Sequence, residues 1–151
     1  MKNKILITVL SIFLILVLAG CSIIPLPDTD KTKIKSIINE YFWAINDQDW
    51  DEAKNCCVYW TDRYDATCDL EECITDLWEQ YGEVKIFCFV TIDNVFIEDK
   101  YADADIYLYV EVTIGIDDIP YYDDSDYYHY YLKEVEESTW KIYGPEIGEF
   151  I

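Results

Sequence analysis

Hydrophobic residues in the first half of the chain recur with the period of an α-helix. Between Ile34 and Ile45 they are spaced three and four residues apart, which predicts a helix over residues 31–46 with one buried face. Asp49, followed three residues later by Glu52, forms a capping-box pattern. A second, shorter helix is therefore expected to begin there.

A third helix is indicated after an irregular stretch over residues 59–67. Asp69 and Glu72 repeat the capping-box pattern, and Gly82 stands where a left-handed residue commonly ends a helix. Between them, the expected buried stripe consists of Leu70, Cys73, Ile74, Leu77, Trp78 and Tyr81.

Further along, the period changes to the two-residue alternation of β-strands. Alternation predicts strands over residues 84–92 and 104–114, and a loop over 115–126 separates these from strands over 127–135 and 139–143. Helices followed by a run of antiparallel strands indicate the α+β class. We expect three N-terminal helices packed on one face of a curved antiparallel sheet of about four strands.

The N-terminal segment differs from everything that follows. Residues 5–18 are largely apolar, Lys2 and Lys4 precede them, and Leu18-Ala19-Gly20-Cys21 closes the run. A basic start, a short apolar core and small residues before a cut site are the parts of a secretory signal. The closing tetrapeptide is similar to the lipobox of bacterial-type lipoproteins. That resemblance implies lipidation of Cys21, removal of residues 1–20 and stable anchoring of the domain to a membrane.

An uncut transmembrane helix is the alternative, and it is disfavoured because residues 5–18 are shorter than the roughly 20 apolar residues of a membrane span. Both alternatives place the rest of the chain outside the cytoplasm, in the cell envelope. Residues 21–30, with Pro25 and Pro27, are expected to form a tether, and residues 31–151 a single domain.

The charge of the chain limits its partners. The sequence carries 31 acidic and 11 basic residues, and its net charge of −20 becomes −22 once Lys2 and Lys4 leave with the signal. Such a charge argues against nucleic acid and against an anionic lipid surface, because both would repel the chain. It favours a cationic protein, peptide or small molecule as a partner. The sequence indicates no cofactor.

Five cysteines remain once Cys21 carries a lipid. Outside the cytoplasm the usual fate of thiols is a disulfide bond, and an odd number leaves one unpaired. We expect two bridges, although neighbouring cysteines are poorly placed to pair with each other. No Cys-x-x-Cys motif supports a structural zinc site. The candidates for disulfide bonds are Cys56, Cys57, Cys68, Cys73 and Cys88.

The order of elements and two short motifs resemble the nuclear transport factor 2-like superfamily over residues 31–143. The motifs are the aromatic and acidic helix junction over residues 41–53 and the closing Thr139-Trp140-Lys141-Ile142. The resemblance implies a cone formed by the helices and a curved sheet. Members of that superfamily include isomerases, cyclases, dehydratases and non-catalytic binding domains. They commonly dimerise through the sheet, so a homodimer is one expectation.

Within that superfamily, ketosteroid isomerases carry an oxyanion-hole tyrosine and a general base at positions similar to Tyr41 and Asp65. A buried phenol can stabilise a developing enolate, and a desolvated carboxylate can abstract a proton. Against catalysis, Tyr41 is already accounted for as part of the helix stripe, and no convincing second carboxylic donor is found in the strands. His129, the only histidine, lacks an identifiable partner to orient it as a base.

The acidic segment over residues 117–126 offers candidate ligands for calcium. Asp123, Asp124 and Asp126 supply the carboxylate oxygens that Ca²⁺ prefers. The EF-hand spacing, its glycine and its terminal glutamate are missing. A solvated acidic loop is therefore the favoured interpretation.

Tyrosines on the strands form the remaining candidate site. Tyr107, Tyr109, Tyr128 and Tyr130 are expected to lie on the concave face of the sheet, as a surface for a ligand or partner. The alternative is that tyrosine simply fills a twisted sheet, where its propensity is high.

Taken together, these patterns predict a lipid-anchored, extracytoplasmic and non-catalytic binding module. An enzyme of the ketosteroid isomerase or cyclase type and a self-associating envelope domain are the alternatives. An enzyme would need a hollow, partly polar cone, whereas a binding module can have its cone filled by Trp43, Trp78 and Phe89.

Overall fold

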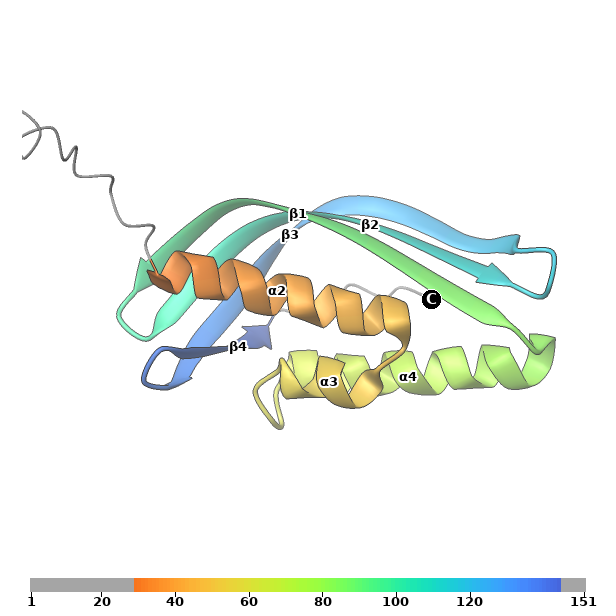
Figure 1. Ribbon diagram of the computed structural model, residues 1–151, viewed down its shortest axis with the longest axis horizontal. Helices are drawn as coiled ribbons and strands as arrows, with labels where there is room; N and C mark the ends of the chain where they lie inside the picture. The colour runs from red at the N-terminus through yellow and green to blue at the C-terminus, as the bar shows by residue number, and fades with distance from the viewer. Residues whose placement is uncertain (1–28, 145–151) are drawn as a thin grey trace, which may run out of the picture.

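The computed structural model describes residues 29–144, and over this part of the chain three helices precede four strands (Figure 1). The lipobox, the signal and most of the expected tether lie outside the described residues. The elements are α2 (Thr29–Asp47), α3 (Trp50–Asn55), α4 (Asp62–Tyr81), β1 (Val84–Glu98), β2 (Tyr101–Ile114), β3 (Ile119–Glu136) and β4 (Thr139–Gly144). This is the predicted α+β architecture. None of the described helices is long and apolar enough to cross a bilayer.

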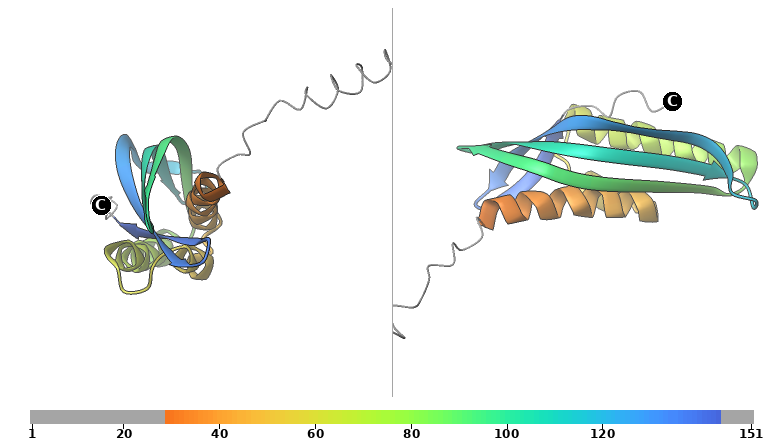
Figure 2. Two further views of the ribbon diagram at one scale, coloured as in Figure 1. Left: turned by 90° about the vertical axis from the view of Figure 1, so that its left-hand side faces the viewer. Right: turned by 90° about the horizontal axis from the view of Figure 1, so that it is seen from above.

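Helix α2 lies along the β1 side of the sheet and buries the apolar face that its sequence predicts (Figures 1 and 2). Ile34, Ile38 and Ile45 are buried along this face, and the rings of Tyr41 and Phe42 pack edge to face between them. The helix begins two residues before its predicted start, so it takes in the end of the expected tether.

Helix α3 begins where the capping box predicts. The carboxylate of Asp49 accepts a hydrogen bond from the backbone N–H of Glu52 at 3.2 Å. The chain that follows α3 then pairs with β4. The Val58 N–H donates to the Ile142 carbonyl at 2.8 Å, and the Ile142 N–H donates to the Cys56 carbonyl at 2.9 Å. This pairing holds the end of the sheet against the helices.

Helix α4 begins at Asp62, well before the predicted start at Asp69. The prediction was wrong because the first inward positions of this helix are polar. Arg63 and Thr67 are both fully buried on the side where the apolar residues of the helix continue. At the other end Gly82 has a φ of 84°, the left-handed conformation predicted for the residue that ends the helix.

The strands form one antiparallel sheet in the order β1-β2-β3-β4, which arches over the helices (Figure 1). The predicted strands over 84–92 and 104–114 are confirmed, and both are longer than expected. The predicted loop over 115–126 is wrong in its second part, because β3 begins at Ile119 and pairs with β2 from there. Aspartate has low strand propensity, so local sequence does not indicate a strand in this acidic segment. The strand forms because it pairs with β2.

Side chains at the end of α2 satisfy the free edge of β1. The side-chain amide of Asn46 both accepts a hydrogen bond from the Cys88 N–H and donates one to the Cys88 carbonyl. The Gln48 amide donates to the Val84 carbonyl at 2.9 Å. These bonds take the place of a neighbouring strand and fix α2 against the sheet.

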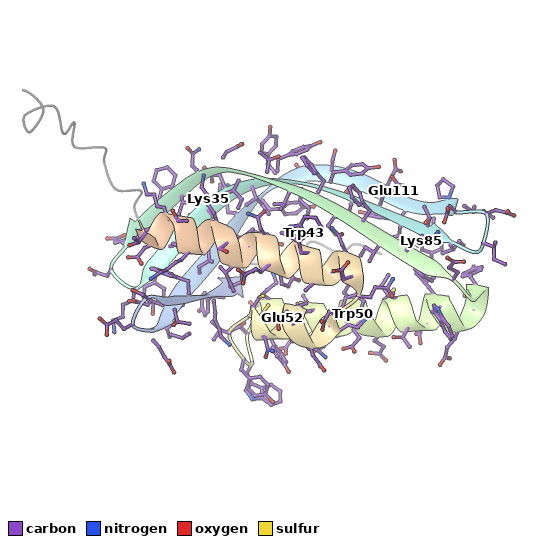
Figure 3. The ribbon with its side chains drawn as sticks, viewed as in Figure 1. Lys35, Trp43, Trp50, Glu52, Lys85 and Glu111 are labelled. Carbon is purple, nitrogen blue, oxygen red and sulfur yellow. The ribbon has the colours of Figure 1, made fainter. Side chains whose placement is uncertain are left out.

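The two faces of the sheet have different surroundings. The inner face points toward the helices, and on β2 it is apolar, as the regular burial of alternate residues from Ala102 to Val112 shows. The outer face carries aromatic and acidic side chains, and Phe87 and Phe89 of β1 are 52% and 55% exposed there. Lys85 and Glu111 mark this face in Figure 3.

Candidate functional site

The only arginine of the chain is buried inside the cone. Arg63, in the first turn of α4, has no exposed surface. Its guanidinium carbon lies 4.3 Å from the ring centroid of Tyr130 and 5.7 Å from that of Tyr41. None of its guanidinium nitrogens, Nε, Nη1 or Nη2, has a hydrogen-bond partner within residues 29–144. Buried charges are normally paired, so this side chain is the anomaly of the structure.

The two aromatic rings offset only part of the cost of burying this charge. Each cation–π contact contributes about 0.5–2 kcal/mol, whereas burying an unpaired ion costs several kcal/mol. Burial raises the pKa of the Tyr41 and Tyr130 phenols, and the opposing effect of Arg63 is smaller. Both phenols therefore stay neutral near pH 7 and supply no counter-charge to the guanidinium.

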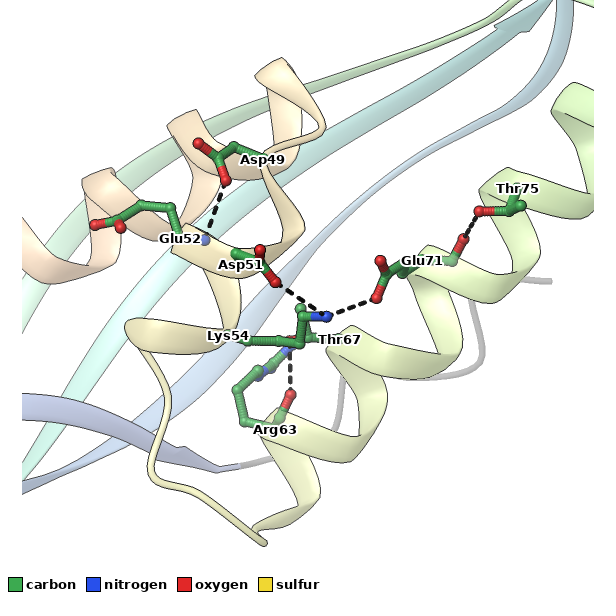
Figure 4. A network of polar contacts seen from close by, with 8 residues as sticks. All are labelled: Asp49, Asp51, Glu52, Lys54, Arg63, Thr67, Glu71 and Thr75. Carbon is green, nitrogen blue, oxygen red and sulfur yellow. Dashed lines mark hydrogen bonds and ion pairs between the residues drawn. The ribbon is translucent and has the colours of Figure 1, made fainter.

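A short chain of hydrogen bonds fixes the surroundings of Arg63, and Figure 4 shows the one between Thr67 and Arg63. The Thr67 hydroxyl donates to the Arg63 carbonyl oxygen at 2.7 Å, and the Tyr41 hydroxyl lies 3.0 Å from Thr67 Oγ1. A threonine hydroxyl has one proton, so Tyr41 is the donor in the second bond. The Tyr41 proton is thus engaged by Thr67 and is not available as the oxyanion donor that the ketosteroid isomerase resemblance implies.

A surface groove lies next to this cluster. It has a volume of about 420 Å³ and is lined by residues of α3, the chain after it, α4 and β4. Cys57 lines the groove, and its sulfur lies 3.9 Å from Thr67 Oγ1 on the inner side. Lys54 in the groove pairs with Glu71 at 2.7 Å (Figure 4), whereas Lys141 has no ion pair in the described part of the chain. Asp51 also lines the groove and lies 3.8 Å from Lys54, so Lys141 is the one lining cation without an ion pair in the described residues.

The apolar interior of the cone is nearly filled. A pocket between α2, α4 and the sheet has a volume of only about 20 Å³, the room of one water molecule. The prediction that Trp43, Trp78 and Phe89 fill the cone is wrong, because these side chains are 68%, 57% and 55% exposed. Figure 3 shows Trp43 on α2, from which its ring projects away from the core. Smaller side chains such as Ile45 and Ile74 line the pocket instead.

Asp65, the candidate general base, lies on the solvent side of α4. It follows Arg63 by two residues, which places it about 200° around the helix from a side chain that faces the interior. None of the described residues that line the apolar pocket carries a carboxylate. The structure therefore does not bring Tyr41 and Asp65 together as a catalytic pair.

The four candidate tyrosines lie on two faces of the sheet. The register pairs Tyr107 with Tyr127, so both point outward and the next residue, Tyr128, points inward. Tyr109 shares the outer face, whereas Tyr130 is fully buried in the cone. The prediction of a single concave tyrosine surface is therefore wrong, although Tyr130 belongs to the Arg63 cluster.

The three calcium candidates are also divided between the faces. Strand alternation places Asp123 on the outer face and Asp124 and Asp126 on the inner face. The Asp124 carboxylate accepts hydrogen bonds from the Tyr122 hydroxyl at 3.1 Å and from the Ser125 N–H at 2.7 Å. The structure does not assemble these carboxylates into one site.

The five described cysteines are all free thiols, so the expected disulfide bonds are not shown. Cys68 and Cys73 are partly exposed on α4, and their five-residue spacing turns them about 140° apart around the helix, too far to pair with each other. Burial raises the pKa of the Cys56 and Cys88 thiols to about 12 and that of Cys57 to about 11. The buried thiols are therefore poor nucleophiles.

Sequence reasoning missed Arg63 because residues 59–67 lack an apolar repeat. The signal that could have found it is spacing rather than hydrophobicity. A stripe with helical spacing runs through Arg63, Thr67, Leu70, Ile74 and Leu77.

Comparisons with known proteins identify the fold. The sequence matches no family model and no curated protein. A conserved protein from Planctomyces limnophilus is similar in structure, with a TM-score of 0.57 at 12% identity over 76% of this chain and 91% of that chain. A protein of unknown function from Mycobacterium tuberculosis gives 0.55 at 14% identity over 76% and 68% of the two chains. A ketosteroid isomerase-like protein from Erwinia carotovora atroseptica gives 0.52 at 12% identity over 74% and 89%. At such identities the similarity concerns the fold alone, and that fold is the nuclear transport factor 2-like α+β cone.

Proposed function

We propose that this protein is a lipid-anchored, extracytoplasmic binding module that recognises a small carboxylate through Arg63. The observation that carries the proposal is a fully buried guanidinium whose nitrogens have no acceptor among residues 29–144. A carboxylate supplies both the missing acceptors and the missing negative charge, in a geometry that the guanidinium matches. A water molecule would satisfy hydrogen bonds but would leave the charge unpaired.

Other unpaired groups in the core point to the same kind of ligand. The indole N–H of Trp140 and the hydroxyl of Tyr130 are buried without a partner in the described chain. Each can donate a hydrogen bond. A core with several spare donors and a fixed positive charge is complementary to an acceptor-rich anion.

The groove beside Cys57 gives such a ligand an approach. Lys54 is already paired with Glu71 and Asp51, so Lys141 is the lining cation whose charge offsets part of the repulsion that an anion meets from the acidic surface. Cys57 lines the groove, and its sulfur lies 3.9 Å from the hydroxyl of Thr67, which is hydrogen-bonded to the Arg63 carbonyl. The net charge of −20 favours a small ligand with a single charge over a polyanion. The cationic partner predicted from the acidic surface remains a prediction for the exterior.

The lipid anchor is proposed from the lipobox-like Leu18-Ala19-Gly20-Cys21. Replacing Cys21 with serine should abolish incorporation of a labelled fatty acid and release the chain from the membrane fraction. Membrane association that survives in Cys21→Ser, with no label in the wild type, would instead support an uncut helix.

Ligand recognition is tested by thermal unfolding of the full chain in detergent with acetate, benzoate or succinate. Acetamide and benzamide serve as neutral analogues, and sodium chloride keeps the ionic strength constant. A carboxylate at 100 times its Kd should stabilise the protein by about 2.7 kcal/mol. Arg63→Met should abolish this response, whereas Lys35→Met, which removes the same charge from the exposed side of α2, should retain it. An equal response of Arg63→Met and wild type would refute the proposal.

A further inference from the structure

A second constellation lies on the outer face of the sheet, on the opposite side from Arg63. Asp103 and Asp105 stand two residues apart on β2, and His129 lies directly opposite Asp105 on β3. His129 Nδ1 lies 2.8 Å from Asp105 Oδ1 and 3.9 Å from Asp103 Oδ1. One ligand atom from each of the three side chains lies within 4.8 Å of the others. We propose that these three residues bind a divalent transition-metal ion.

The hydrogen-bonding capacity of the imidazole supports this proposal. Nδ1 carries at most one proton, so it can donate to one of the two carboxylates. Asp105 takes this bond at 2.8 Å, whereas Asp103 Oδ1 is buried and has no hydrogen-bond partner in the described chain. An unpaired carboxylate oxygen beside a second carboxylate is unfavourable without a cation. A bound dication would neutralise both carboxylates and accept the imidazole nitrogen as a third ligand.

The present distances are close to those that a metal requires. Zinc–oxygen and zinc–nitrogen bonds of about 2.0–2.2 Å place tetrahedral ligand atoms roughly 3.2–3.6 Å apart. The imidazole-to-carboxylate distances of 2.8 and 3.9 Å lie on either side of this range. Small side-chain rotations on two paired strands are therefore enough to close the site.

A neighbouring residue orients one of the carboxylates. The Asn94 side-chain amide donates to Asp105 Oδ2 at 3.2 Å, and this leaves Oδ1 to face His129. Asn94 stands opposite Asp105 because the β1–β2 register shifts between Ile92 and Asn94. A β-bulge that aims a side chain at a metal-binding carboxylate is a common supporting device.

The ligand set indicates which ions fit. One imidazole and two carboxylates suit zinc, manganese or cobalt, whereas calcium and magnesium prefer oxygen ligands alone. The side chains of Asp105, Asp103 and His129 are 29%, 39% and 66% exposed, so water can complete the coordination sphere. Zinc should bind more tightly than manganese, in the usual order of divalent ions.

The site contains the only histidine of the chain, which provides a specific probe. We would titrate the untagged full chain in detergent with Mn²⁺ and follow the imidazole proton signals of His129 by NMR. Manganese also avoids competition from the free thiols, because it prefers oxygen and nitrogen ligands. The His129 signals should broaden at the lowest Mn²⁺ concentrations. Signals that stay sharp up to one equivalent of bound Mn²⁺ would overturn the proposal without any variant.

Variants then separate the site from general attraction of cations to an acidic surface. Asp103→Asn and Asp105→Asn should each weaken Mn²⁺ binding at least tenfold, and Asn94→Ala should weaken it less. Asp124→Asn and Asp126→Asn remove the same charge from the inner face of β3 and should leave affinity unchanged. Equal small losses in all four aspartate variants would mean diffuse binding and would overturn the proposal. All four aspartates are at least partly exposed, and circular dichroism would verify that the variants fold.

Discussion

Replacing Arg63 with methionine is expected to stabilise the protein in the absence of ligand. Exchanging a buried ion pair for apolar residues of similar volume is often neutral or stabilising by about 1–4 kcal/mol, and an unpaired charge has no ion pair to lose. The contacts of the guanidinium with Tyr130 and Tyr41, at 4.3 and 5.7 Å, are lost in the variant and reduce this gain. We therefore expect a net gain of about 1–2 kcal/mol. The midpoint of thermal unfolding should rise by about 4 °C per kcal/mol.

Urea unfolding of the wild type and Arg63→Met, without added carboxylate, measures this difference. The slope of the free energy of unfolding against urea concentration should be the same for both proteins, since the surface exposed on unfolding does not change. Arg63→Lys serves as a second variant. It keeps the charge but loses the planar stacking on the rings, so it should be less stable than the wild type. If Arg63→Met lowered the free energy of unfolding by more than about 1 kcal/mol, the guanidinium would have a structural role, and the proposal that its charge is unpaired in the absence of ligand would be refuted.

Three further predictions follow from other parts of the structure. Asn46→Leu should lower the free energy of unfolding by about 1–3 kcal/mol, because it leaves both backbone groups of Cys88 unpaired, and chemical denaturation measures this loss. In the reduced protein at pH 8, maleimide should label Cys68 and Cys73 first and the buried thiols only after unfolding, as mass spectrometry would show. If the exposed aromatic outer face forms a homodimer, Phe87→Glu should convert it to a monomer in light scattering, and an unchanged mass would exclude this face.

Local patterns predicted the elements whose inward positions are uniformly apolar. Helix α2, the glycine end of α4 and the central parts of β1 and β2 agree with the structure for this reason. Periodicity works there because burial of a continuous apolar face is the dominant stabilising contribution. Periodicity did not predict the start of α4 or the first half of β3, because polar residues occupy the inward positions there. These segments adopt their structure only through contacts with neighbouring elements.

The candidate sites depended on contacts between distant parts of the chain. Tyr41, Arg63 and Tyr130 come from α2, α4 and β3, and no spacing rule joins them. The triad of Asp103, Asp105 and His129 requires the register between β2 and β3. A shift of one residue in that register would turn His129 to the inner face.

The sequence by itself therefore determined the α+β class, the order of helices before strands and the strongly acidic character. Only the tertiary structure decided that the one arginine is buried without a counter-charge, and that tyrosines close in sequence face opposite sides of the sheet. The physical reason is the distance along the chain over which each property is set. Hydrophobic periodicity is set by a few neighbouring residues, whereas the environment of a charge is set by every group that folding brings around it.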